Sequence, residues 1–242
     1  MHIKKFNLIV KGKIPSYKKK IIVDPDKSIS IRSFLLGSIS QKISCVDNVL
    51  ESEDVYSAIK ACKKLGVKIK KIKTGSYKIF GKGLGSLSAK KNTVLNFGNS
   101  GTLARLLIGI LSTTPNIDII IKGDHSLNKR SMKKLINLMS EFGAHFLPKN
   151  KFTFPLRMIS SEMPVGINYE SGVSAQLKSA VILAGLNSNG NTTIEELISS
   201  RNHTENILKD NAKTIKIDNK IKKTIKVFGK KNLNPININI GG

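Results

Sequence analysis

The chain has 242 residues, a hydrophobic fraction of 40% and a formal net charge of +25. Its length allows a full hydrophobic core, in one large domain or two smaller ones. The charge alone favours a nucleic-acid-binding module, but only five of the 41 basic residues are arginine, and the lysine clusters lack interleaved aromatic residues for base stacking. We therefore expect no nucleic-acid partner and keep that module as an alternative that rests on charge alone.

Several classes of protein are disfavoured by features that the sequence lacks. No apolar run is long enough to span a membrane, and residues 1–10 have the pattern of a strand, not of a signal peptide. Cys45 and Cys62 form neither a CxxC motif nor a metal-ligand cluster, and the four histidines lack HExxH spacing. We expect a cytoplasmic enzyme with no membrane association and no metal site.

A unit of about seventy residues repeats along the chain. Each copy opens with a loop that contains Ser or Gly, followed by an apolar helix of small residues that is expected to be buried. The loops lie at 26–32, 98–105 and 171–176, and the helices that follow them at 33–40, 106–112 and 177–186.

A short β-rich segment and an amphipathic helix complete each copy. The β-rich segments lie at 43–49, 117–121 and 192–197, and the amphipathic helices at 55–65, 132–142 and 205–208. Strand-like alternation then follows, as at 67–73 and 214–218. The pattern predicts an α/β domain of three β-α-β-α-β-β repeats, with the apolar helices inside and the sheets and amphipathic helices around them.

The buried helices are expected to point their N-termini toward one common face. Free amides and the positive end of a helix dipole favour an anion there. Four of the five arginines lie in or beside the loops, namely Arg32, Arg105, Arg130 and Arg201, and only Arg157 lies in a strand-like stretch. A guanidinium fits phosphate and carboxylate geometry better than an ammonium does, so the sequence predicts a site for anionic ligands on this face.

Five motifs in these loops resemble, in order and spacing, those of the 5-enolpyruvylshikimate-3-phosphate synthase family. They are KSISIRS at 27–33, GNSGT at 98–102, GDHSL at 123–127 with Arg130, SAQLKSA at 174–180 and SRNHTE at 200–205. The likeness runs from about residue 20 to the end of the chain. The family fold is two domains, each of three such β/α units, which agrees with the repeat found independently.

The resemblance implies a transferase of the shikimate pathway to chorismate and the aromatic amino acids. It moves the enolpyruvyl group of phosphoenolpyruvate to the 5-hydroxyl of shikimate 3-phosphate and releases phosphate. Those two small molecules are the implied partners. The resemblance implies no cofactor, and it implies a monomer when full length.

Site residues are carried over from the family motif by motif. Lys27 matches a lysine that touches both substrates, and we predict a catalytic role for it. The predicted shikimate 3-phosphate contacts are Lys27, Ser28, Arg32, Ser174, Ala175, Gln176 and Arg201. The predicted phosphoenolpyruvate contacts are Lys27, Asn99, Gly101, Thr102 and Arg130.

The family assigns its acidic proton-transfer residues to the C-terminal half, which this chain does not include. We therefore expect an N-terminal portion that lacks most of the acid–base apparatus and is inactive alone. The expected domains are strands of a second domain at 1–12, the three-repeat domain at 13–232, and the start of the truncated second domain at 233–242.

Two further alternatives stay open. A non-catalytic truncated remnant could at most bind shikimate 3-phosphate. The sister enolpyruvyl transferase that acts on UDP-N-acetylglucosamine shares the fold, but it typically begins its first loop with Lys-Asn and carries a reactive loop cysteine. Here the pair is Lys27-Ser28, and no cysteine lies between Ile110 and Arg130.

Overall fold

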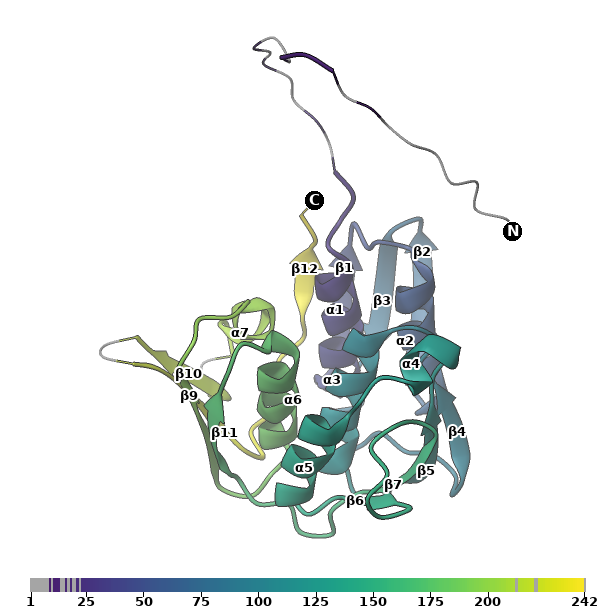
Figure 1. The fold of residues 1–242 in the computed structure, drawn as a ribbon, viewed down its shortest axis with the longest axis vertical. Coiled ribbons are helices and arrows are strands. Elements are labelled where there is room, and N and C mark those ends of the chain that lie inside the picture. The colour runs from purple at the N-terminus through teal and green to yellow at the C-terminus, as the bar shows by residue number, and fades with distance from the viewer. Residues whose placement is uncertain are drawn as a thin grey trace.

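A computed structural model describes residues 9, 11–13, 16, 18, 21, 23–211, 213–219 and 222–241. It contains three four-stranded sheets around a set of central helices (Figure 1). The predicted α/β class and the three repeats are therefore confirmed. The strand predicted at the start of the chain lies almost wholly outside the described residues.

The three sheets share one strand order. Each has a lead-in strand parallel to the strand that follows the buried helix, and then an antiparallel hairpin. The first is β12 (Asn237–Asn239), β1 (Ile43–Asp47), β3 (Ser76–Phe80) and β2 (Lys68–Lys73). The second is β4 (Thr93–Asn96), β5 (Asp118–Lys122), β7 (Leu156–Ile159) and β6 (His145–Leu147). The third is β8 (Asn168–Ser171), β9 (Asn191–Glu196), β11 (Lys223–Phe228) and β10 (Ile215–Asp218).

The central helices are α1 (Lys27–Ile39), α3 (Gly101–Ser112) and α6 (Ala175–Leu186). They are buried over most of their length, as predicted, because apolar and small side chains occur all round them. Their predicted starts were wrong: each helix begins inside the segment assigned to the preceding loop. Caps explain the difference, because the side chains of Asp26, Ser100 and Ser174 accept hydrogen bonds from the third helical amide and allow an early start.

The amphipathic helices lie outside the central three. They are α2 (Glu53–Lys64), α5 (Lys133–Glu141) and the short α7 (His203–Leu208), close to the predicted segments. A further short helix, α4 (His125–Asn128), forms where only a turn was expected. Gly66 and Gly143 follow α2 and α5 with φ of +86° and +94°, which confirms the predicted glycine stops.

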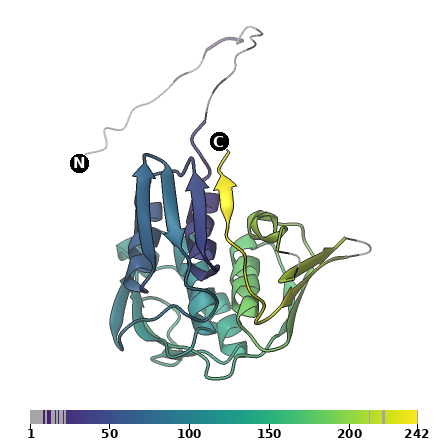
Figure 2. The same ribbon diagram turned by 180° about the vertical axis from the view of Figure 1, so that it is seen from behind.

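The first sheet is completed by a strand from the far end of the chain. β12 pairs in parallel with β1, at the position that β4 and β8 occupy in the other two sheets (Figure 2). The segment 233–242, predicted to begin a second domain, thus contributes a strand to the first sheet. The domain boundaries themselves stay a prediction.

Helices α3 and α6 run parallel in close contact. Thr113 Oγ1 donates to the Ala184 carbonyl at 3.2 Å near their C-terminal ends, and Gln176 Nε2 donates to Thr102 Oγ1 at 3.0 Å near their N-terminal ends. Between these contacts, a Cβ added at Gly109 would lie 2.6 Å from the Ala180 carbonyl oxygen. A glycine at this position therefore allows the approach that places the two N-termini side by side.

We expect Gly109→Ala to lower the free energy of unfolding by about 1–3 kcal/mol, since the added methyl group meets backbone and not a flexible side chain. This cost exceeds the roughly 1 kcal/mol that alanine gains over glycine in helix propensity. Denaturant unfolding measures the change. Gly172→Ala is the control, because a Cβ there has nothing within 4 Å, and equal stability of the two variants would contradict the close approach.

Glu51 joins the α2 loop to the β2–β3 hairpin. Its carboxylate accepts hydrogen bonds from Lys71 Nζ at 2.7 Å, the Gly75 amide at 2.9 Å, Tyr77 Oη at 2.8 Å and Tyr56 Oη at 2.9 Å. The Lys71 bond, and after it the Gly75 amide, lower the pKa of the Glu51 carboxyl to about 2. Because the folded pKa lies below its ordinary value of 4.5, the stability it contributes is present above about pH 4.5 and is lost as the pH falls toward 2.

We therefore expect Glu51→Gln to lower the melting temperature at pH 7 and to differ little from the parent chain near pH 2. Melting curves recorded from pH 7 to pH 2 measure this convergence. Glu162→Gln, at an exposed carboxyl, serves as control. A constant difference across the pH range would show that Glu51 does not carry the predicted acid sensitivity.

In the part of the chain that the structure describes, no helix has the length and apolar character needed to cross a membrane. No group of three or more His, Cys, Asp and Glu side chains that could hold a metal ion occurs there either.

Candidate functional site

The N-terminal ends of α1, α3 and α6 meet at one face, as the sequence predicted. Gln176 at the start of α6 bonds to Thr102 at the start of α3, and Arg32 in the second turn of α1 reaches Ser179 of α6 at 3.1 Å. The cap oxygens of Ser100 and Ser174 accept from Leu103 N and Leu177 N, both at 3.3 Å. Three positive helix ends are thus held together by side-chain bonds between the helices.

Arg32 lies beneath this face and is only 3% exposed. Its Nε donates to Thr204 Oγ1 at 2.9 Å, its Nη2 to Ser179 Oγ, and its Nη1 to the carbonyl and hydroxyl oxygens of Ser28. Burial lowers the pKa of the Arg32 guanidinium to about 10, and the nearby Glu205 carboxylate partly opposes this effect. Four of the five guanidinium N–H donors of Arg32 are engaged within the protein. Arg32 therefore holds Ser28 in place and has one N–H left for a ligand.

Arg105 connects α3 to α6. Its Nη1 donates to the Gly101 carbonyl at 3.0 Å and to Gln176 Oε1 at 2.9 Å, while the Gln176 amide donates to Thr102. Burial, and after it the charge of Arg130, lower the pKa of the Arg105 guanidinium. The sequence places Arg105 among the loop arginines but predicts no ligand for it. The signal that marks it is an arginine in a lysine-rich chain.

Arg130 approaches the same point from the loop after α4. Its Nη2 donates to Asn99 Oδ1 at 2.7 Å and to Ser126 Oγ at 3.4 Å. A Cβ placed on Gly101 would lie 2.8 Å from Arg105 Nη1 and 3.3 Å from Arg130 Nη1, so both guanidinium groups flank Gly101. Their hydrogen-bond partners among the described residues are neutral, so two positive charges meet at a helix N-terminus without a paired carboxylate.

Lys27 occupies the first position of α1 and points toward α2. Its Nζ lies 2.8 Å from Asp54 Oδ2, and its side chain is 51% exposed. A lysine is disfavoured at a helix N-terminus because it faces the positive end of the dipole. Here the Asp54 carboxylate holds the ammonium in place, half exposed, beside a helix end that favours anions.

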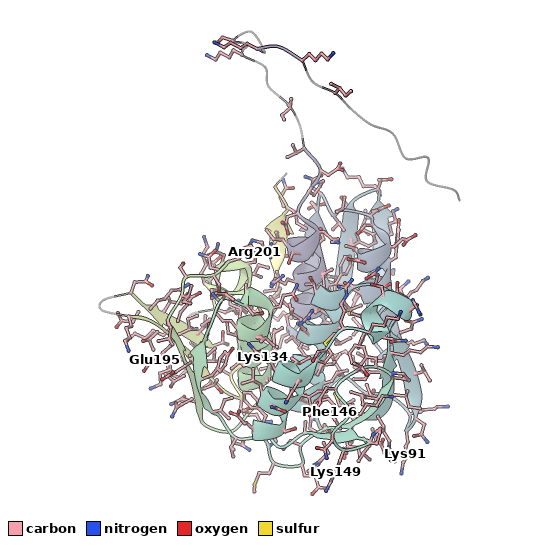
Figure 3. The ribbon with its side chains drawn as sticks, viewed as in Figure 1. Lys91, Lys134, Phe146, Lys149, Glu195 and Arg201 are labelled. Carbon is pink, nitrogen blue, oxygen red and sulfur yellow. The ribbon has the colours of Figure 1, made fainter. Side chains whose placement is uncertain are left out.

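Arg201 is exposed and lies in the segment between β9 and α7 (Figure 3). Two neighbours shape this segment: Glu196 Oε1 accepts from the amide and hydroxyl of Ser200 at 2.8 Å, and Thr204 bonds to Arg32. Burial, and after it the charge of Arg32, lower the pKa of the His203 imidazole. Arg201 thus lies in a segment that is attached to Arg32 through Thr204, at the start of α7.

The predicted site residues fall into groups on the same face. Ser28 and Arg32 are bonded directly; Thr102 and Gln176 are bonded directly; Asn99 and Arg130 are bonded directly. Ser174 and Ala175 begin α6, and Gly101 begins α3. Sequence reasoning missed a set of buried charges behind the face, Lys178, Glu196 and Glu205, because a lysine within an apolar helix gives no periodic signal.

A cavity of about 760 Å³ opens between α5 and α6, beside this face. Arg105 and Ser174 reach it from the site, and Lys133, Lys134 and Tyr169 line its outer part. Burial, and after it the nearby Glu141 carboxylate, raise the pKa of the Tyr169 hydroxyl.

Comparisons with known proteins agree with this architecture. Residues 13–242 match the family model described as EPSP synthase (3-phosphoshikimate 1-carboxyvinyltransferase). A 3-phosphoshikimate 1-carboxyvinyltransferase of Paramagnetospirillum magneticum is 39% identical over 81% of this chain and 44% of its own length. One from Zymomonas mobilis is 36% identical over 97% of this chain and 52% of its own length.

A solved structure of this family has a similar fold. The EPSP synthase of Acinetobacter baumannii superimposes with a TM-score of 0.81 and 35% identity, over 92% of this chain and 49% of that one. The chain spans about half the length of the curated relatives it matches. Because the family model covers nearly the whole sequence, and the three capped helix ends with their arginines agree with it, the chain belongs to the EPSP synthase (3-phosphoshikimate 1-carboxyvinyltransferase) family.

Proposed function

We propose that this chain provides the substrate-binding face on which the full-length protein transfers the enolpyruvyl group of phosphoenolpyruvate to shikimate 3-phosphate. The observation that carries the proposal is the convergence of Arg105 and Arg130 on Gly101. Among the described residues, all hydrogen-bond partners of these two guanidinium groups are neutral. Two unpaired guanidinium groups at a helix N-terminus fit a phosphate or a carboxylate. Family membership supplies the identity of the two anions.

The proposed contacts follow the three helix ends. Shikimate 3-phosphate is bound by Lys27, Ser28, Arg32, Ser174, Ala175, Gln176 and Arg201, and phosphoenolpyruvate by Lys27, Asn99, Gly101, Thr102 and Arg130. Arg105 adds the second guanidinium beside Gly101. Holding the two polyanions side by side removes much of the entropic cost of their reaction. Lys27, at the edge between α1 and α2, is proposed to stabilise negative charge on both substrates as phosphate leaves.

We further propose strands of a second domain at 1–12, the three-repeat domain at 13–232 together with β12, which pairs with β1, and the start of the second domain in the rest of 233–242. The acid–base groups for proton transfer are proposed to lie in the C-terminal half of the full-length protein. Location in the cytoplasm and a monomeric full-length state stay predictions.

Calorimetric titration of the chain with shikimate 3-phosphate tests the binding part of this proposal, with shikimate as the ligand control. We expect binding that needs the phosphate and that weakens by about 10- to 150-fold in Arg201→Ala, the loss of about 1.5–3 kcal/mol typical of a charged hydrogen bond. Arg157→Ala is the matched control, because Arg157 bonds to Asp118 on β5 at 2.7 Å, away from the helix ends.

Two results would overturn the proposal. Equal affinity for shikimate and its phosphate would remove the anion-binding role, and equal losses in the Arg201 and Arg157 variants would show that the loss is not local. Binding of shikimate 3-phosphate without turnover by any longer form of the protein would support the non-catalytic truncated remnant instead.

A further inference from the structure

Lys178 is an unusual residue for the interior of an apolar helix. It lies in the first half of α6, its side chain is 0% exposed, and its Nζ lies 2.7 Å from both Glu196 Oε1 and Glu205 Oε1. An ammonium can be buried in this way only when it is paired and hydrogen-bonded. The two carboxylates come from different elements, the end of β9 and the start of α7.

The two carboxylates mark the two ends of the segment that carries Arg201. Glu196 is the last residue of β9, Glu205 lies in the first turn of α7, and both are held by the same ammonium. Within the segment, the amide and hydroxyl of Ser200 donate to Glu196 Oε1 at 2.8 Å. The residue before Arg201 is therefore fixed to the carboxylate that Lys178 binds.

The cluster balances its own charge. Lys223 of β11 lies 2.6 Å from Glu196 Oε2 and 3.7 Å from Glu205 Oε1, which gives two ammonium groups for two carboxylates. Burial alone raises the pKa of the Glu196 carboxyl, but hydrogen bonds from Lys178, Lys223 and Ser200 lower it to about 2. Glu196 therefore stays ionised, and the attachment persists near neutral pH.

Lys178 also belongs to the helix that begins with Ser174, Ala175 and Gln176. Its own amide donates to the Ser174 carbonyl at 3.1 Å, so it lies one turn from the helix start. The next residue, Ser179, accepts hydrogen bonds from both Arg32 and Thr204. The buried ammonium thus lies where the α6 end, the Arg201 segment and the α1 arginine come together.

We propose that Lys178 is a positioning residue: it holds the Arg201 segment in register with the N-terminus of α6, so that both contact the phosphorylated substrate together. The inference rests on the proposed function for its ligand. The attachment itself is a property of the protein without ligand and can be measured separately. If Lys178 were purely structural, it would stabilise the fold without fixing the position of the Arg201 segment.

Digestion with an arginine-specific protease measures the attachment, since the chain has only five arginines. In Lys178→Met we expect cleavage after Arg201 to become about tenfold faster, because local opening of the segment becomes easier. Cleavage after Arg130, in another exposed loop, is the internal control and should not change. Equal acceleration at both arginines, or none at Arg201, overturns the proposal.

A charge-balanced variant separates positioning from stability. Lys178→Met with Glu205→Met removes one ion pair and leaves Glu196 with Lys223, and replacing a buried pair by apolar residues is often neutral for stability. We expect an unchanged melting temperature together with faster cleavage after Arg201 and about tenfold weaker binding of shikimate 3-phosphate. Unchanged cleavage in this variant, at equal stability, contradicts the proposed role.

A double-mutant cycle shows whether Lys178 acts through Arg201. In an Arg201→Ala background the charge-balanced change should cost little further affinity, and a full additional loss would assign Lys178 a separate role. If the parent chain does not bind shikimate 3-phosphate at all, the proposed function fails for this chain. The protease result still decides whether the attachment exists.

Discussion

Lys27→Met is expected to weaken shikimate 3-phosphate binding by about 10- to 150-fold while leaving the fold intact. The loss corresponds to about 1.5–3 kcal/mol for one charged hydrogen bond to an anion. Stability should change by no more than about 0.5 kcal/mol, because the Lys27 side chain is half exposed and the lysine opposes the α1 dipole. In the full-length protein proposed above, the same change is expected to lower kcat/KM by about 10²-fold or more.

Lys91→Met provides the matched control for this prediction. Lys91 is also an exposed lysine paired with an aspartate, at 3.6 Å from Asp118, and in Figure 3 it lies far from Arg201. The Lys91→Met variant should bind shikimate 3-phosphate as the parent chain does. Asp54→Asn is a second comparison: it releases Lys27 without removing it, so affinity should be retained. Unaltered binding in Lys27→Met would remove Lys27 from the site.

The central helices could be predicted because their residues are apolar or small on every side, which indicates burial. An apolar stretch preceded by Ser or Gly and followed by a polar turn identifies each central helix. The starts were misplaced because Ser and Gly favour both loops and caps. Only the hydrogen bond that the Leu103 amide donates to Ser100 Oγ shows that the helix has already begun. This error matters for the site, since Lys27 and Ser28 lie on a rigid helix and not in a loop.

Two features could not be predicted from one sequence. β12 is three residues long and pairs with β1 about 190 residues away, so neither its length nor its alternation identifies a partner. The buried Lys178 joins two carboxylates that become neighbours only after β9 and α7 have packed on α6. Loop arginines were better indicators, because arginine in a lysine-rich chain marks positions where the planar guanidinium matters.

Arg130→Ala is expected to weaken phosphoenolpyruvate binding, measured with shikimate 3-phosphate present, by about 10- to 100-fold. The change removes one of the two guanidinium groups that flank Gly101 and leaves Asn99 without its 2.7 Å donor. Shikimate 3-phosphate alone should bind much as before. Arg130→Lys should recover only part of the affinity, since an ammonium cannot present two parallel donors to a phosphate.

Arg105 and Arg130 repel one another, and an anion between them removes that cost, so the two residues should be strongly non-additive. Burial is the larger cause of the lowered pKa of the Arg105 guanidinium, and the Arg130 charge is the second cause. We therefore expect Arg130→Ala to stabilise the ligand-free chain slightly while it weakens ligand binding, and added salt to reduce both effects. Arg157→Lys, which loses a two-bond contact with Asp118, should show the reverse pattern of lower stability with unchanged affinity. If both variants lowered stability and affinity together, the paired guanidinium groups would be a structural element of the fold and not the binding site for the second anion.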